Sequence, residues 1–189
     1  MIRPSDIPFD ISYTFDSDLR DVPHSPQEME KAVLYLEARI ASGELDELEE
    51  IQALGMAGVL LRVLGRLDKA HDCLERAVAL CKQQGNVRGE LVNTLRLAHV
   101  YQWQRDYATA DALFSSALAW CKSDPSLADY LDFAYQHTGK SLFDQGRYHE
   151  AAEMFERALK IRLNKGDAEL IGSTRLALET TQTRIKLEA

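Results

Sequence analysis

The strongest chemical signature in the chain lies between residues 134 and 141. This segment reads Ala-Tyr-Gln-His-Thr-Gly-Lys-Ser, which fits a relaxed phosphate-binding loop with Ala134 in place of the first glycine. In such a loop, free backbone amides cradle the phosphates and the lysine, here Lys140, contacts them. That chemistry needs a loop between a strand and a helix. The surrounding pattern predicts an uninterrupted helix whose amides are already bonded, so we predict no nucleotide site.

A second candidate is a metal site beginning at His149. The sequence His149-Glu150 is followed by Glu153, whereas the helical zinc signature has a second histidine at that place. No other histidine stands at ligand spacing. We therefore interpret the segment as the exposed start of a helix and predict no metal.

The cysteines are the remaining candidates for chemistry. Cys73 and Cys81 are eight residues apart on one predicted helix, which is too far for a disulfide. Cys121 lacks the helix N-terminus or cationic surroundings that lower a thiol pKa. We interpret all three as reduced thiols that pack between helices. With no Ser/His/Asp arrangement either, the sequence predicts neither an enzyme nor a cofactor.

The candidate residues above lie in or beside a block of apolar residues that recurs along the chain. It begins at residues 65, 105 and 146, so its period is first 40 and then 41 residues. Spacings of three and four place its members on one face of a helix. Self-similarity at this period indicates a helical solenoid. The three sets are Gly65, Leu67, Ala70, Leu74 and Ala77; Arg105, Tyr107, Ala110, Phe114 and Ala117; and Gly146, Tyr148, Ala151, Phe155 and Ala158.

A small residue also recurs upstream of each block, at Gly58, Ala98 and Gly139. Glycine inside a helix costs about 0.5–1 kcal/mol relative to alanine. We therefore expect each of these residues to mark a close contact between two helices. Each unit is then a pair of antiparallel helices joined by a tight turn at 65–66, 105–106 or 146–147.

The third unit carries the clearest family pattern. Tyr135-x-x-Thr138-Gly139-x-x-Leu142 is followed by Gly146-x-Tyr148-x-x-Ala151-x-x-x-Phe155-x-x-Ala158. This resembles the tetratricopeptide repeat (TPR), and the resemblance covers roughly residues 51–187. The common period of 34 residues is exceeded, so the chain resembles the longer variant of about 40 residues. The family's proline is missing, and Lys82 stands at its place in the first unit. The resemblance implies an all-α right-handed superhelix, a TPR solenoid of about eight helices.

The pattern predicts the following organisation. Residues 1–24 form an irregular arm, in which apolar residues at odd positions from 9 to 15 favour an extended segment. The arm either is a disordered tail or docks on the solenoid or on a second subunit. The solenoid covers 25–189: a degenerate capping helix and linker (25–50), repeats at 51–86, 87–124 and 125–166, and a capping helix (167–189). Helices are expected near 26–42, 45–64, 67–83, 88–104, 107–122, 126–145, 148–164 and 167–187.

Charge and hydropathy exclude several partners. The net charge of −8 and the pI near 5.1 argue against nucleic acid or an anionic membrane as the main partner. No apolar run approaches the 18 residues of a membrane span. The first six residues lack the apolar core of a signal peptide. We therefore expect a cytoplasmic protein.

The resemblance also implies a binding surface, because the first helix of each repeat lines the concave face in this family. The chaperone-tail-binding subfamily clamps a carboxylate there with lysine and asparagine, but Gly55 and Val59 stand at those places, so we do not expect that ligand. Trp103 and Phe143 beside basic residues have the composition of a binding hot spot. Alternatively, helix packing or the arm buries the face. The candidate residues are Val59, Arg62, Val63, Leu95, His99, Gln102, Trp103, Phe133, Gln136, Lys140 and Phe143.

These observations favour a non-catalytic scaffold for protein–protein interaction. It would bind an apolar or amphipathic peptide or helix on the concave face. Two alternatives use the same residues. One is a peptide- or ligand-responsive signalling regulator, with residues 1–42 as its effector surface. The other is a homodimer.

Overall fold

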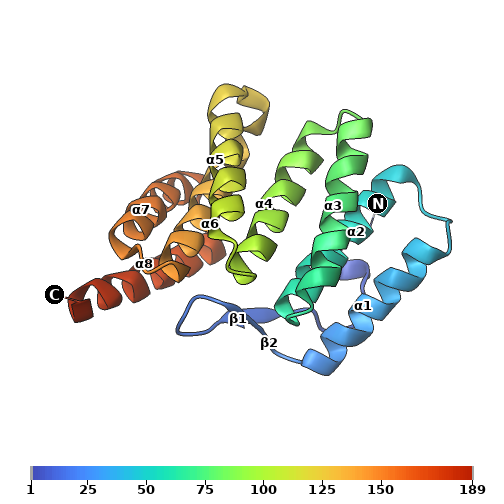
Figure 1. The fold of residues 1–189 in the computed structure, drawn as a ribbon, viewed down its shortest axis with the longest axis horizontal. Coiled ribbons are helices and arrows are strands. Elements are labelled where there is room, and N and C mark those ends of the chain that lie inside the picture. The colour runs from blue at the N-terminus through green and yellow to red at the C-terminus, as the bar shows by residue number, and fades with distance from the viewer. Residues whose placement is uncertain (1, 189) are drawn as a thin grey trace. The chain divides into compact units, whose positions relative to one another are not determined.

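The computed structural model describes residues 2–188. Within them the chain forms eight α-helices, which confirms the predicted all-α repeat fold (Figure 1). The predicted helix at 126–145 is divided, because the short 3-10 helix η2 (Pro125–Tyr130) precedes α6. The helices are α1 (Pro26–Ala41), α2 (Glu47–Val63), α3 (Leu67–Gln83), α4 (Val87–Trp103), α5 (Tyr107–Ser123), α6 (Leu131–Asp144), α7 (Tyr148–Lys165) and α8 (Ala168–Glu188).

The arm has more structure than the irregular segment predicted from the sequence. After a 3-10 turn, η1 (Pro4–Asp6), it forms a hairpin of two three-residue strands, β1 (Tyr13–Phe15) and β2 (Asp21–Pro23). The strands are antiparallel, and Thr14 pairs with Val22. The arm is therefore an ordered element over its described residues, 2–24.

The described chain divides into two compact units. The first contains the residues up to Asp16 and those from Arg20 to Arg105, and thus both strands and α1–α4. The second contains Ser17–Leu19, which is the loop of the hairpin, and the residues from Asp106 onward, with α5–α8. The division falls after α4, inside the segment 87–124 that the sequence assigns to one repeat. Within each unit, consecutive helices pack against one another.

Helix starts follow from local capping chemistry. Ser25 accepts a hydrogen bond from the Glu28 amide at 3.4 Å, and Pro26 occupies the first turn of α1. Asp46 and Glu49 form a reciprocal capping box at the start of α2. Each such cap stabilises a helix by about 1 kcal/mol.

The predicted close contacts at glycine are confirmed within both units. A Cβ at Gly58 on α2 would overlap the Leu74 side chain on α3. A Cβ at Gly139 on α6 would stand 2.7 Å from Cε1 of Phe155 on α7. The glycine of the first helix therefore admits the large apolar residue of the second helix, which explains why the two recur together.

The tight turns between paired helices require a left-handed backbone. Gly65 and Gly146 both have φ of +74°, which glycine adopts without strain. Arg105 occupies the same position in the second repeat with φ of +63°. The turn geometry is therefore retained there by a residue for which it is unfavourable.

Candidate partner-binding surface

The predicted binding residues all lie on α2, α4 and α6, and none of them is exposed. Side chains that line an open groove would be exposed to solvent, whereas most of these are covered by other parts of the protein. Whether they bind a partner stays a prediction. Those that are buried are Arg62, Val63, Leu95, His99, Gln102, Gln136, Lys140 and Phe143, and those that are partly buried are Val59, Trp103 and Phe133.

In the first unit, the arm covers part of this set. Strand β2 packs against α2. From β2, Asp21 accepts a hydrogen bond from Arg62 Nη2 at 2.6 Å. The two side chains are only 5% and 6% exposed, respectively. A buried charge is tolerated only when it is paired, so this contact fixes the arm to α2.

Trp103, at the end of α4, joins the same cluster. The guanidinium carbon of Arg62 lies 4.8 Å from the centre of its ring, and that of Arg20 lies 5.2 Å away. Both distances are within the range of cation–π attraction. One arginine comes from α2 and the other from the arm, so the indole holds the arm beside the ion pair.

Further contacts seat the arm over the first unit. The backbone amide of Ile2 donates to Gln52 Oε1 at 2.7 Å. Phe9 meets Tyr35 of α1 edge-on, with ring centres 6.3 Å apart. We call Gln52, Arg62 and Trp103, the residues of α2 and α4 that hold the arm, the arm-binding surface.

The pKa of Tyr13 in β1 depends on the charged residues near this surface. Its pKa is raised, first by desolvation and second by the nearby Asp21 carboxylate, while Arg62 and Arg96 oppose the shift. The residue as a whole is 41% exposed. The raised pKa thus reflects both burial and the negative charge of Asp21.

His99 and Gln102 have a structural role within α4. Nδ1 of His99 lies 2.8 Å from Oε1 of Gln102, and both side chains are buried. Because an amide oxygen can only accept a hydrogen bond, Nδ1 carries the proton. The pair satisfies two polar groups internally and leaves them covered.

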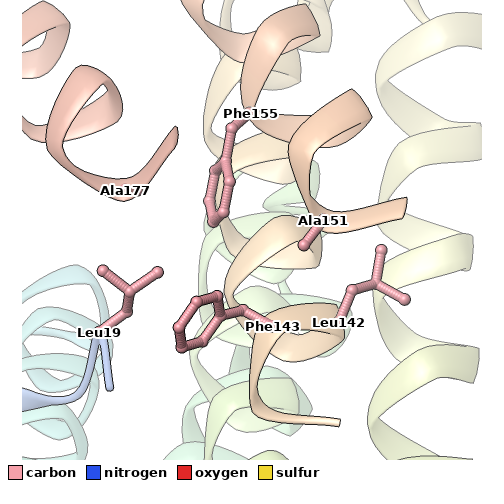
Figure 2. Packing of buried hydrophobic residues seen from close by; sticks show 6 residues of the cluster. All are labelled: Leu19, Leu142, Phe143, Ala151, Phe155 and Ala177. Atoms are coloured by element: carbon pink, nitrogen blue, oxygen red, sulfur yellow. The ribbon is translucent and has the colours of Figure 1, made fainter. Parts of the chain in front are cut away.

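In the second unit, the hairpin loop covers Phe143. Leu19 is 2% exposed and shares a buried cluster with Phe143 of α6 and Phe155 of α7. Figure 2 shows the Leu19 side chain pointing toward the Phe143 ring. Asp18 next to it pairs with Arg184 of α8 at 2.6 Å. Phe143 is therefore a core residue of this unit, in addition to its place on the predicted surface.

The segment that resembles a phosphate-binding loop lies inside α6, as predicted. Lys140 is buried there, and the turn that precedes α6 is a 3-10 helix instead of a strand. Gln136, one turn away, has both side-chain polar atoms buried without a hydrogen-bond partner. Phe133 stacks on His137 with ring centres 6.4 Å apart. None of these arrangements provides a cradle of free backbone amides.

A buried charge network in the second unit was missed from the sequence. Arg162 Nε donates to Asp132 Oδ2 at 2.9 Å, and Nη1 donates to Thr174 Oγ1 at 2.6 Å. Lys165 Nζ contacts Asp132 Oδ1 at 2.5 Å. The repeat register contains the missing signal, because Arg162 occupies the position that holds buried cysteines in the other repeats, Cys81 and Cys121.

The described residues show no arrangement suited to catalysis by metal or thiol. Among residues 2–188, no group of three or more His, Cys, Asp or Glu side chains could hold a metal ion. The three cysteines are free thiols. Burial raises the pKa of Cys73, Cys81 and Cys121, which disfavours the reactive thiolate. In the same described part of the chain, every helix is too short or too polar to cross a membrane.

Similar folds occur in solved TPR-like structures. The nearly identical TPR-like repeats of a Podosopora anserina protein named as a kinesin light chain align with a TM-score of 0.59 and 17% identity, covering 85% of this chain and 81% of that chain. Another crystal structure of these repeats gives a TM-score of 0.60, also at 17% identity, and covers 85% and 80%. BtubC (BKLC) from P. vanneervenii gives 0.55 at 18% identity and covers 85% and 68%. At such identities the similarity shows the fold alone.

The sequence itself matches a family over part of its length. Residues 90–179 match the family model described as Tetratricopeptide repeat. This range includes α5, α6 and α7, and thus the third repeat, on which the resemblance rests. Assignment to the longer-period variant stays a prediction. The match to the tetratricopeptide repeat model thus covers residues 90–179, and the described chain has an all-α helical repeat fold.

Proposed function

We propose that this chain is a non-catalytic scaffold that binds a peptide segment of a partner protein on the arm-binding surface. TPR domains generally mediate protein–protein interactions and are typically non-catalytic. One observation carries the proposal: the surface already holds an extended segment, the chain's own arm, through the Asp21–Arg62 ion pair beside Trp103. A surface that binds one extended segment has the chemistry to bind another.

The composition of the surface supports this role. Arginine and tryptophan are enriched among residues that dominate the energy of protein interfaces. Here Arg62 and Trp103 lie 4.8 Å apart, with the indole presenting its ring to the guanidinium. The arm buries only part of its own hydrophobic surface, since Tyr13 and Val22 remain 41% and 42% exposed. A partner that covers more apolar area would have an energetic advantage over the arm.

The seated arm also supports a second candidate, a peptide-responsive regulator in which the arm controls access to the surface. Under this proposal, weakening the arm by Asp21→Asn increases capture of the partner. Unchanged capture would contradict regulation by the arm and leave the scaffold function in place. A homodimer through the same residues remains a prediction.

The scaffold function is tested by comparing the two tryptophans of the chain. Tagged wild type, Trp103→Ala and Trp120→Ala are used to capture proteins from a lysate of the source cells, after circular dichroism has shown equal helicity. Trp120 is a matched control because it lies on α5, which belongs to the second unit, whereas the arm-binding surface belongs to the first. We expect a partner that Trp120→Ala retains and Trp103→Ala loses at least tenfold. Equal capture by all three proteins would refute the surface assignment.

A further inference from the structure

The pairing of Arg62 restricts what can lie on the arm-binding surface. When a segment covers α2, the guanidinium loses its water and needs a carboxylate in exchange. Asp21 supplies that carboxylate at 2.6 Å in the arm. A neutral segment in the same place would leave a buried charge without a partner. The surface therefore selects against neutral occupants and in favour of acidic ones.

The arm does not use all of the binding capacity of Arg62. Nη2 is paired with Asp21, whereas Nη1 is buried and has no hydrogen-bond partner among the described residues. A guanidinium can hold both oxygens of one carboxylate through two parallel hydrogen bonds, and such bidentate pairs are stronger than single contacts. A ligand carboxylate that engages both nitrogens would bind better than Asp21 does.

The residue before Asp21 adds a second element of recognition. Arg20 places its guanidinium carbon 5.2 Å from the centre of the Trp103 ring, which also receives Arg62. An exposed or partly desolvated indole attracts a further cation by its ring face. The occupant thus presents two adjacent residues of opposite charge, the basic one to Trp103 and the acidic one to Arg62.

The arm has the features of an occupant that can be displaced. Its strands have three residues each, and a two-stranded hairpin alone is marginally stable in water. It remains bound to the arm-binding surface because it is part of the same chain. Such tethering gives the arm an effective concentration on the order of millimolar. A free segment must compete with that concentration, so weakening the tethered arm uncovers the binding capacity.

We propose that Arg62 and Trp103 form a subsite for an extended peptide that carries a basic residue directly followed by Asp or Glu, and that the partner binds by displacing Arg20-Asp21 of the arm. The proposal rests on the proposed function and specifies the partner for the same surface. The acidic residue is internal to the partner's chain, since Asp21 binds through its side chain in the middle of a segment.

The test uses the full chain and a labelled synthetic peptide with the sequence of residues 11–24 as the probe. Fluorescence anisotropy measures its binding to wild type and to Asp21→Asn, whose helicity and melting are compared first. We expect at least tenfold tighter binding to Asp21→Asn, because its own arm has lost the ion pair. Equal binding to the two proteins, or none to either, would overturn displacement of the arm.

Two altered peptides then test the carboxylate directly on the Asp21→Asn protein. A peptide with Asp21→Asn is expected to bind at least tenfold more weakly, whereas one with Asp18→Asn, the matched control, is expected to stay within twofold. Asp18 is suitable because it forms an exposed ion pair with Arg184 in the second unit. Equal loss from both changes would contradict a specific subsite at Arg62.

Extending the acidic side chain tests the unpartnered nitrogen of Arg62. A peptide with Asp21→Glu is expected to bind at least as tightly as the native peptide, because the longer side chain can reach both nitrogens. Loss of binding by this peptide would contradict the bidentate geometry. If all peptides fail while a lysate partner still depends on Trp103, the proposed function stands and only this subsite is refuted.

Discussion

Arg162 and Asp132 form an ion pair of 2.9 Å in which the side chains are 2% and 0% exposed. Replacing the arginine leaves a carboxylate whose remaining cationic partner among residues 2–188 is Lys165, and loss of one partner of a buried pair costs about 3–5 kcal/mol. We therefore expect Arg162→Met to lower the free energy of unfolding by about 3 kcal/mol in urea titrations.

A double variant separates the charge effect from packing. In Arg162→Met combined with Asp132→Leu, the uncompensated carboxylate is gone, and apolar replacements of buried pairs are often neutral. We expect this protein to recover most of the lost stability. Lys160→Ala on the exposed face of the same helix is the control and is expected to change little. A double variant as unstable as the single one would show that the charge is not the cause.

We predict that Arg105 strains the backbone of its turn and that glycine at this position relieves the strain. It has φ of +63° where Gly65 and Gly146 stand in the other repeats. Arg105→Gly removes the steric penalty and introduces a more flexible unfolded chain, so we expect a net gain of about 0.5–1 kcal/mol. Gly146→Ala at the equivalent turn is expected to lose about 1 kcal/mol. Thermal unfolding measures both, and a loss of stability in Arg105→Gly would contradict the prediction.

Gly139 and Gly172 make a matched pair in the second unit. A Cβ on Gly139 would stand 2.7 Å from Phe155, whereas nothing lies within 4 Å of a Cβ on Gly172. We expect Gly139→Ala to cost about 1–3 kcal/mol by overpacking the joint between α6 and α7. Gly172→Ala, inside α8, is expected to gain about 0.5–1 kcal/mol from helix propensity. Equal effects in chemical denaturation would refute the close-packing explanation.

Leu19 is expected to stabilise the second unit although it belongs to the arm. Its side chain is 2% exposed in the cluster with Phe143 and Phe155. Leu19→Ala removes that buried volume, at a cost of about 2–5 kcal/mol. Hydrogen exchange of the α6 and α7 amides is expected to accelerate accordingly. Asp18→Ala beside it removes an exposed ion pair with Arg184, so it is the control, with an expected cost below about 1 kcal/mol. Similar protection in both variants would contradict the prediction.

The repeat register predicts much of the fold because it records helix packing. Gly58 and Gly139 recur for the same reason, which is a close approach to a large residue on the next helix. The register also contains the signal for Arg162, whose position holds Cys81 and Cys121 in the other repeats. A charged residue in a column of buried residues indicates a buried partner, although not which one.

The arm could be predicted only in part. Alternating apolar residues correctly favoured an extended segment, and docking on the helices was one of two stated alternatives. The contact with Arg62 could not be predicted, because Asp21 and Arg62 are 41 residues apart and the arm lies outside the repeat. For the same reason, the sequence left open whether this face is available to a partner or is buried by helix packing or the arm. The divided helix reflects a local effect, since Asp124 caps the Ser126 amide at 2.8 Å and begins a 3-10 turn.

The most direct test of the arm-binding surface follows Trp103 itself during peptide binding. The full chain with Asp21→Asn and Trp120→Phe has Trp103 as its one tryptophan, since the sequence contains two. The unlabelled peptide of residues 11–24 is titrated into it while indole emission is recorded. A saturable shift of the emission, abolished by Arg62→Gln, is the predicted result. An unchanged spectrum at millimolar peptide would contradict binding of an extended acidic segment at Arg62 and Trp103.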